Sequence, residues 1–68
     1  KIYTMTETKV YKLHDSIHVE AFTTSLGIEG IKHNVFEYEE YTAIEVTGTP
    51  LEIIRASTIY QQAIAFKL

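Results

Sequence analysis

Residues 41–54, Tyr41-Thr-Ala-Ile-Glu-Val-Thr-Gly-Thr-Pro-Leu-Glu-Ile-Ile54, change from a strand pattern to the start of a helix within three residues. Ile44 and Val46 alternate with small or polar neighbours, which is the period of two expected of a strand with one buried face. Gly48 interrupts that pattern, and no further alternation follows it. This part of the chain therefore predicts a half-buried strand that ends at Gly48.

The helix start follows directly after the predicted strand. Thr49 is a suitable N-cap, and Pro50 suits the first helical position because no amide hydrogen is needed there. Glu52 stands three residues after Thr49 and completes a capping-box pattern. A strand that leads into a helix through so short a loop predicts an α+β fold, with a helix packed on a sheet.

The length and composition predict one small domain that covers residues 1–68. A chain of 68 residues buries only about 60% of its unfolded surface, so its stability is expected to be marginal. The chain contains no cysteine, which excludes disulfides and thiolate metal sites as stabilising devices. Oligomerisation is therefore a stronger expectation than usual. The hydrophobic fraction of 46% is ordinary for a folded domain.

The charge balance argues against nucleic acid as a partner. Nine acidic residues face six basic ones, for a formal net charge of −3, and the lysines are scattered along the chain. Arg55 is the only arginine and so the only candidate for bidentate contacts to phosphate or guanine. No apolar run approaches the ~20 residues of a membrane span. We expect a cytoplasmic protein, although a chain that starts at Lys1 leaves open a leader or a preceding domain.

The remaining strands can be placed from their alternation. Residues 2–13 read as an opening strand with a polar middle, 31–39 as a second strand and 42–47 as a third. The second and third strands are expected to form a hairpin that turns near residues 39–41. Because this turn contains neither Gly nor Asn, the connection is expected to be longer or bulged and not a two-residue type I′ turn.

The segment 15–27 has two readings. As a helix it has Asp15 or Ser16 as its cap and Gly27 as a left-handed stop whose hydrophobic contact comes from Ile28. The apolar stripe of this helix would be Val19, Phe22 and Leu26. As a strand, residues 16–24 alternate β-branched and polar side chains. We favour the helix, because its start and stop signals agree with the stripe.

The secondary structure of the C-terminal residues also has two interpretations. The helix that begins at Pro50 is expected to reach about Gln62, and residues 63–68 either continue it or form an edge strand. Alternation of Ile64 and Phe66 favours the strand. Continuation is favoured by a loose apolar stripe, which consists of Leu51, Ile54, Ile59, Ala63 and Phe66.

With both helices present, the expected order is βαββα with a possible last strand. This order resembles the split βαβ of a ferredoxin-like sandwich, a small antiparallel sheet with helices on one face. The resemblance concerns the fold alone, and such folds carry many unrelated functions. If residues 16–24 form a strand, the alternative is a four-stranded meander with a C-terminal helix.

The sequence provides little support for catalysis or metal binding. His14 and His18 are four residues apart and share a face in a helix or a strand, but neither cysteine nor an HExxH pattern accompanies them. The serines lie in no nucleophile motif. Gly27 and Gly30 flank Glu29, which would repel a phosphate. We therefore expect no enzyme, no cofactor and no metal.

The one stretch that indicates a function is the acidic aromatic run Phe36-Glu37-Tyr38-Glu39-Glu40-Tyr41. Phe36 and Tyr38 share one strand face, and Glu37 and Glu39 share the other. The aromatic face is either exposed, as at interfaces, or it is the core face of the hairpin under the helices. Glu37 and Glu39 could also raise each other's pKa, although a solvated strand face is the simpler interpretation.

Two functions follow from these observations. The first is a small non-enzymatic interaction module, such as an inhibitor, adaptor or regulator, that binds a basic or mixed protein surface through residues 36–41. The second is a homo-oligomeric subunit that senses a small ligand bound between copies.

Overall fold

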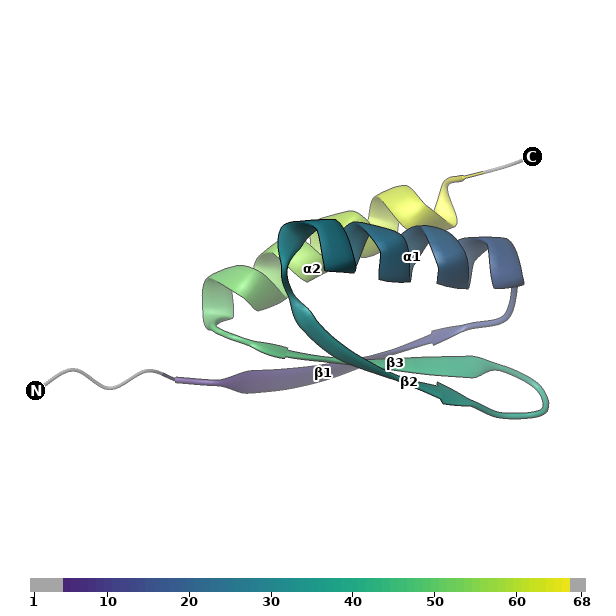
Figure 1. Ribbon diagram of the computed structural model, residues 1–68, viewed down its shortest axis with the longest axis horizontal. Coiled ribbons are helices and arrows are strands. Elements are labelled where there is room, and N and C mark those ends of the chain that lie inside the picture. Colours follow the sequence, from purple (N-terminus) through teal and green to yellow (C-terminus); the bar gives the residue numbers. More distant parts are fainter. Residues whose placement is uncertain (1–4, 67–68) are drawn as a thin grey trace, which may run out of the picture.

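Strand β3, Thr42–Gly48, lies in the middle of a three-stranded antiparallel sheet (Figure 1). The computed structural model describes residues 5–66. Strands β1, Glu7–Leu13, and β2, Lys32–Glu37, flank β3 in the order β1-β3-β2. Helices α1, Ser16–Glu29, and α2, Pro50–Ile64, both lie on the same face of the sheet. The predicted α+β fold with the order βαββα is confirmed.

The strand register shows which side chains face the helices. Ile44 pairs with Tyr11 of β1 and with Val35 of β2, and paired residues point to the same face of a sheet. Ile44 and Val46 are fully buried in the core. Because successive side chains alternate between faces, Ala43 and its partners point to the opposite face. We call this face, which no helix of the described residues covers, the open face.

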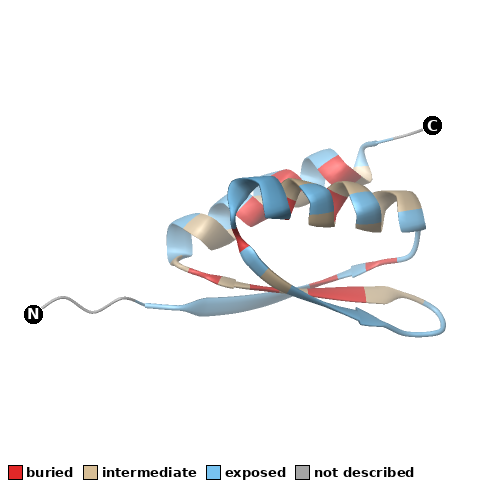
Figure 2. Ribbon diagram, in the orientation of Figure 1, coloured by how far each residue is buried: buried red, intermediate tan, exposed pale blue. Residues whose placement is uncertain are grey.

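The core is formed where the two helices meet the covered face of the sheet (Figure 2). Helix α1 contributes Phe22 and Leu26, which are fully buried. The ring centroid of Tyr11 lies 5.1 Å from that of Phe22 and 4.6 Å from that of Tyr60 on α2. Each fully buried large hydrophobic side chain stabilises the fold by about 1.5–3 kcal/mol. A few such side chains therefore account for most of what holds so small a domain together.

Helix α2 begins as the sequence predicts. The Thr49 amide donates to Oε1 of Glu52 at 2.9 Å, and the Glu52 amide donates to Oγ1 of Thr49 at 3.2 Å. This reciprocal pair is the predicted capping box, with Pro50 in the first turn. Both bonds satisfy amides that have no partner within the helix. The predicted helix start is confirmed.

The C-terminal end of α2 decides between a helix and an edge strand for most of residues 63–68. The helix runs to Ile64, and the Phe66 amide donates to the carbonyl of Ala63. An edge strand is therefore wrong for residues 63–66, and residues 67–68 lie outside the described part. The predicted stripe is right at Ile59 and Ala63 but wrong at Leu51, Ile54 and Phe66, which are exposed. The helix packs through Ala56 instead.

Residues 16–24 are helical, so the strand alternative and the four-stranded meander are wrong. The predicted stop at Gly27 is also wrong, because α1 continues to Glu29 and ends at Gly30, whose φ is 73°. The Gly30 amide donates to the Gly27 carbonyl, and the Ile31 amide donates to the Leu26 carbonyl. This is a Schellman motif, and its hydrophobic contact comes from buried Ile31 and not from exposed Ile28.

Strands β1 and β2 are shorter than predicted. The strand expected over 2–13 begins at Glu7, and residues 2–4 lie outside the described part. The strand expected over 31–39 covers Lys32–Glu37. The Tyr38 amide donates to the Tyr41 carbonyl at 2.9 Å across the turn. Among the described residues no non-glycine residue has a positive φ, so the prediction that this turn is not type I′ is confirmed.

Candidate protein-interaction site

The acidic aromatic run forms the end of β2 and the turn into β3. Phe36 pairs with Ala43, so its side chain points to the open face. The Tyr38–Tyr41 hydrogen bond continues the same register by one further pair beyond Glu37 and Thr42. Tyr38 and Tyr41 therefore also belong to the open face. The interpretation that Phe36 and Tyr38 form the core face is wrong, because both helices cover the opposite side.

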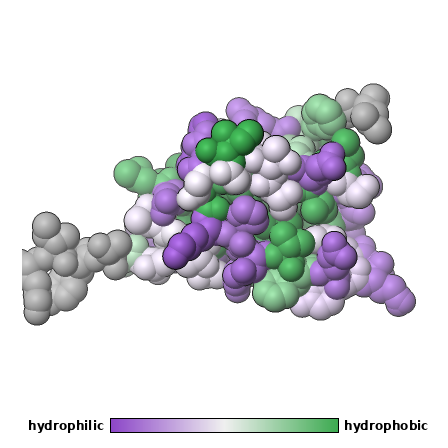
Figure 3. Space-filling view, viewed as in Figure 1, coloured by the Kyte–Doolittle hydropathy of each residue, from purple (hydrophilic) through white to green (hydrophobic). Residues whose placement is uncertain are grey.

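Three aromatic side chains of the open face form what we call the aromatic patch: exposed Phe36 and Tyr38, and partly buried Tyr41. The rings of Tyr38 and Tyr41 are stacked, with centroids 5.0 Å apart and an interplanar angle of 18°. Phe36 is 46% exposed and Tyr38 is 57% exposed. Figure 3 shows hydrophobic side chains at the surface below α1 and over β2, among polar ones. The aromatic patch is a rigid amphipathic surface that the fold leaves uncovered.

Lys12 of β1 extends the aromatic patch with a positive charge. Its Nζ atom lies 5.0 Å from the centroid of the Tyr41 ring, within the range of a cation–π interaction. Lys12 pairs with Ala43, so β1 and β2 place their side chains on either side of Ala43. This contact helps to fix the orientation of the Tyr41 ring.

Two of the three carboxylates of the acidic aromatic run border the patch. Glu39 and Glu40 form the tip of the turn between Tyr38 and Tyr41, and both are exposed. Glu37 pairs with Thr42 and points to the helix side of the sheet, where it too is exposed. We call Glu39 and Glu40 the acidic tip. The aromatic patch is thus bordered by negative charge at the turn and by one lysine on β1.

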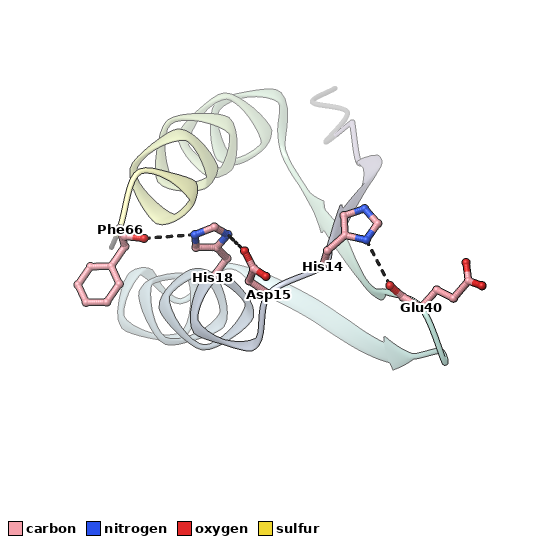
Figure 4. A network of polar contacts seen from close by, with 5 residues as sticks. All are labelled: His14, Asp15, His18, Glu40 and Phe66. Atoms are coloured by element: carbon pink, nitrogen blue, oxygen red, sulfur yellow. Dashed lines mark hydrogen bonds and ion pairs between the residues drawn. The ribbon is translucent and has the colours of Figure 1, made fainter. Parts of the chain in front are cut away.

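A histidine attaches the acidic tip to the body of the protein (Figure 4). The His14 Nδ1–H group donates to the Glu40 carbonyl oxygen at 3.2 Å, so Nδ1 carries the proton in this geometry. The ring centroid of His14 lies 6.4 Å from that of Tyr41. The short segment between β1 and α1 therefore restrains the turn, which reduces the ordering cost of binding through it.

His18 has different partners, so the two histidines form no common site. Its Nδ1 atom lies 3.6 Å from a carboxylate oxygen of Asp15, and its Nε2 atom lies 3.2 Å from the Phe66 carbonyl oxygen (Figure 4). His18 thus joins the start of α1 to the segment after α2. Within residues 5–66 no group of three histidine, cysteine or acidic side chains is arranged to hold a metal ion.

An ion pair lies at the other end of the helix layer. The Arg55 guanidinium donates to the Glu29 carboxylate at 3.0 Å and joins α2 to the end of α1. This hydrogen bond, together with the positive charge of Arg55, lowers the pKa of Glu29 below its usual value. Both side chains are partly exposed, so the pair links the helices without forming a closed site.

A shallow hollow of about 570 Å³ lies where α1 passes into β2. It is lined by residues from the end of α1 and from β2, together with one residue of β3: Gly27, Gly30, Ile31, Lys32, His33, Asn34 and Thr47. A side chain at Gly27 or Gly30 would meet nothing within 4 Å. Six of these residues lie within residues 27–34, and the pairing of β2 with β3 adds Thr47.

Comparison with known proteins finds no matching family model, no significantly similar curated protein and no significantly similar solved structure. Among the described residues, neither helix has the length and apolar character needed to cross a membrane. The functional proposal below therefore rests on the geometry of the sheet and its turn.

Proposed function

We propose that this protein is a small non-enzymatic interaction module, an inhibitor, adaptor or regulator, that binds another protein through the aromatic patch and the acidic tip. The observation that carries the proposal is the stacked pair of Tyr38 and Tyr41 beside exposed Phe36, on a face that no described helix covers. Buried aromatic side chains supply much of the binding energy at protein interfaces.

The physical features of the site suit this role. Stacked tyrosines offer a large, rigid contact area and lose little conformational freedom on binding. Their hydroxyl groups supply polar contacts at the rim of an interface. The acidic tip adds negative charge beside the patch, so the expected partner has a basic or mixed surface. Glu37 points to the helix side of the sheet, so its charge lies on the face opposite the patch.

The proposal is tested by capturing partners with the wild-type chain and with matched alanine variants as bait. Tyr38→Ala removes an exposed aromatic side chain from the patch, and Ile28→Ala removes an exposed hydrophobic side chain from α1. We expect a partner that is retained by Ile28→Ala and whose affinity for Tyr38→Ala is about thirtyfold weaker, as for an interface hot spot. Equal retention by both variants would contradict the proposal.

The role of the acidic tip is tested separately by reversing its charge. Replacing Glu39 and Glu40 with lysine is expected to slow association with the captured partner and to reverse the salt dependence of the association rate, because salt would then screen a repulsion. Unchanged association would show that the partner surface is not basic.

The hollow beside Lys32 supports a second candidate function, a homo-oligomeric subunit that senses a small ligand. Lys32 offers a positively charged donor there, whereas the Asn34 amide already donates to the Glu45 carboxylate at 3.3 Å. A small carboxylate such as an amino acid is therefore the expected ligand class, with Lys32 as its main contact. Thermal unfolding of the wild type with amino acids, nucleotides or divalent metals tests this candidate, with Lys32→Ala as the control. A shift that Lys32→Ala abolishes would support it, and no shift with any of these ligands would reject it.

A further inference from the structure

The outer edge of β1 is a second unpartnered feature of the sheet. β3 pairs with one side of β1, and no strand within residues 5–66 pairs with its other side (Figure 1). The ladder with β3 runs from Glu7 to Leu13 without a bulge, so β1 is regular along its whole length. Such an edge presents a row of free backbone donors and acceptors to another strand.

Helix α2 packs on β1 and carries a hydrophobic flank. The flank consists of three partly buried side chains at spacings of seven and four residues, which place them on one side of the helix: Ile53, Tyr60 and Ile64. Arg55 lies on the other side of the helix and pairs with Glu29 of α1. The Tyr60 ring of the flank also contacts Phe22 of α1, with ring centroids 5.7 Å apart. The Tyr60 ring lies 4.6 Å from the ring of Tyr11, so the flank lies above β1. A strand added beside β1 would place alternate side chains beneath this flank.

We propose that β1 of a second copy of this chain pairs antiparallel with β1, about a two-fold axis at Thr8, to give a continuous six-stranded sheet. In this register Glu7 of each copy lies opposite Lys9 of the other, so two cross-strand ion pairs form. Met5 of each copy lies opposite Tyr11 of the other, beneath the flank of α2. Met5 is 67% exposed in the single chain, so pairing would remove an exposed hydrophobic side chain from water.

Alternative registers that keep both helix layers on one side of the sheet are less complementary. A two-fold axis at Lys9 places the two Lys9 side chains directly opposite each other, which is destabilising. An axis at Val10 forms no ion pair between β1 strands and leaves Met5 beyond the end of the partner strand. The axis at Thr8 is the one of these three that both pairs opposite charges and covers Met5.

The pairing leaves the aromatic patch free. Figure 2 shows exposed residues over the N-terminal part of β1, where the proposed axis lies. The acidic tip lies at the opposite end of the sheet, beside Leu13 and Thr42. The antiparallel arrangement would place the two tips at opposite ends of the six-stranded sheet. This inference therefore goes beyond the proposed function and does not depend on it.

Disulfide trapping tests the register, because the chain has no cysteine of its own. Directly opposite residues have Cα atoms about 4.5–5.5 Å apart, which is within the reach of a disulfide. We expect Thr8→Cys to form a covalent dimer under mild oxidation, because each Thr8 faces its own copy. Val10→Cys lies on the same face and edge but faces Thr6, and Thr58→Cys lies on the exposed surface of α2. Cross-linking of Thr8→Cys no faster than of either control would overturn the proposal.

Light scattering over a hundredfold range of concentration tests the pairing and its charges. We expect a dimer for the wild type, about tenfold weaker association for Glu7→Lys and for Lys9→Glu, and recovery to near the wild-type value when both are combined. Glu20→Lys makes the same charge change on the exposed surface of α1 and is expected to leave association unchanged. A monomer throughout the range, or no recovery in the double variant, would overturn the proposal.

Tyr38→Ala separates this inference from the proposed function. Because the aromatic patch is not part of the proposed dimer interface, this variant is expected to dimerise as the wild type does while losing the captured partner. Loss of the dimer in Tyr38→Ala would show that self-association uses the aromatic patch and would overturn the pairing through β1.

Discussion

The two faces of the sheet carry similar hydrophobic side chains in different environments. On the covered face, Ile44 and Val46 are fully buried beneath two helices. On the open face, Phe36 and Tyr38 keep about half of their surface in contact with solvent, although they belong to the same hairpin. Strand parity thus divides the hydrophobic and aromatic residues of one hairpin between the core and a solvent-exposed face, where we propose that a partner binds.

The largest expected effect is the difference in stability loss when phenylalanine is replaced by alanine on each of the two faces. Phe22→Ala removes a fully buried ring from the core and is expected to cost about 3–5 kcal/mol, enough to unfold most of a domain this small. Phe36→Ala removes a half-exposed ring from the open face and is expected to cost less than about 1 kcal/mol. Chemical denaturation of both variants measures the difference. Equal losses would mean that the open face is part of the core.

A smaller difference in stability is expected between alanine variants of two threonines that are close in sequence. Thr49→Ala removes one half of the capping box of α2 and is expected to lower the free energy of unfolding by about 1 kcal/mol. Thr47→Ala changes a residue of the open face whose hydroxyl lies 3.4 Å from that of Thr8, and is expected to change stability by less than about 0.5 kcal/mol. Thermal unfolding compares them. A larger loss for Thr47→Ala would contradict the division between the faces.

The smallest effect concerns the ion pair of the helix layer. Arg55 lowers the pKa of Glu29 in the folded protein, mainly through its hydrogen bond and then through its charge. The stabilisation is therefore complete above the usual pKa of Glu29, 4.5, and is lost as the pH falls from there through the lowered pKa. Glu29→Gln should remove this part of the acid dependence. Unfolding measured from pH 7 downward in both proteins would reject this expectation if their acid profiles were the same.

The sequence predicts the start of α2 well because the signals there are local. Thr49, Pro50 and Glu52 lie within four residues, and their chemistry requires no contact with the rest of the chain. The end of α1 depends instead on tertiary packing. Gly27 and Gly30 are both suitable stops, and the buried position of Ile31 selects Gly30. Local patterns could not make this choice.

The candidate site can be predicted only in part, because its strand alternation is local whereas the choice of the covered face depends on tertiary packing. Alternation shows that Phe36 and Tyr38 share a face, but it does not show which face the helices cover. That depends on the packing of Tyr11 and Ile44 against α1 and α2. The contact between Lys12 and Tyr41 joins β1 to the turn before β3, and it is visible only once the strand register is known.

Tyrosine nitration followed by peptide mass spectrometry is the most direct test of whether the open face is free for a partner. Tyr38 is 57% exposed on the open face, whereas Tyr11 is 6% exposed in the core. We expect Tyr38 to be nitrated at least tenfold faster than Tyr11 in the folded protein, because the reagent must reach the ring from solvent. Protection of Tyr38 to the level of Tyr11 would contradict the central claim that the aromatic patch is an available binding surface.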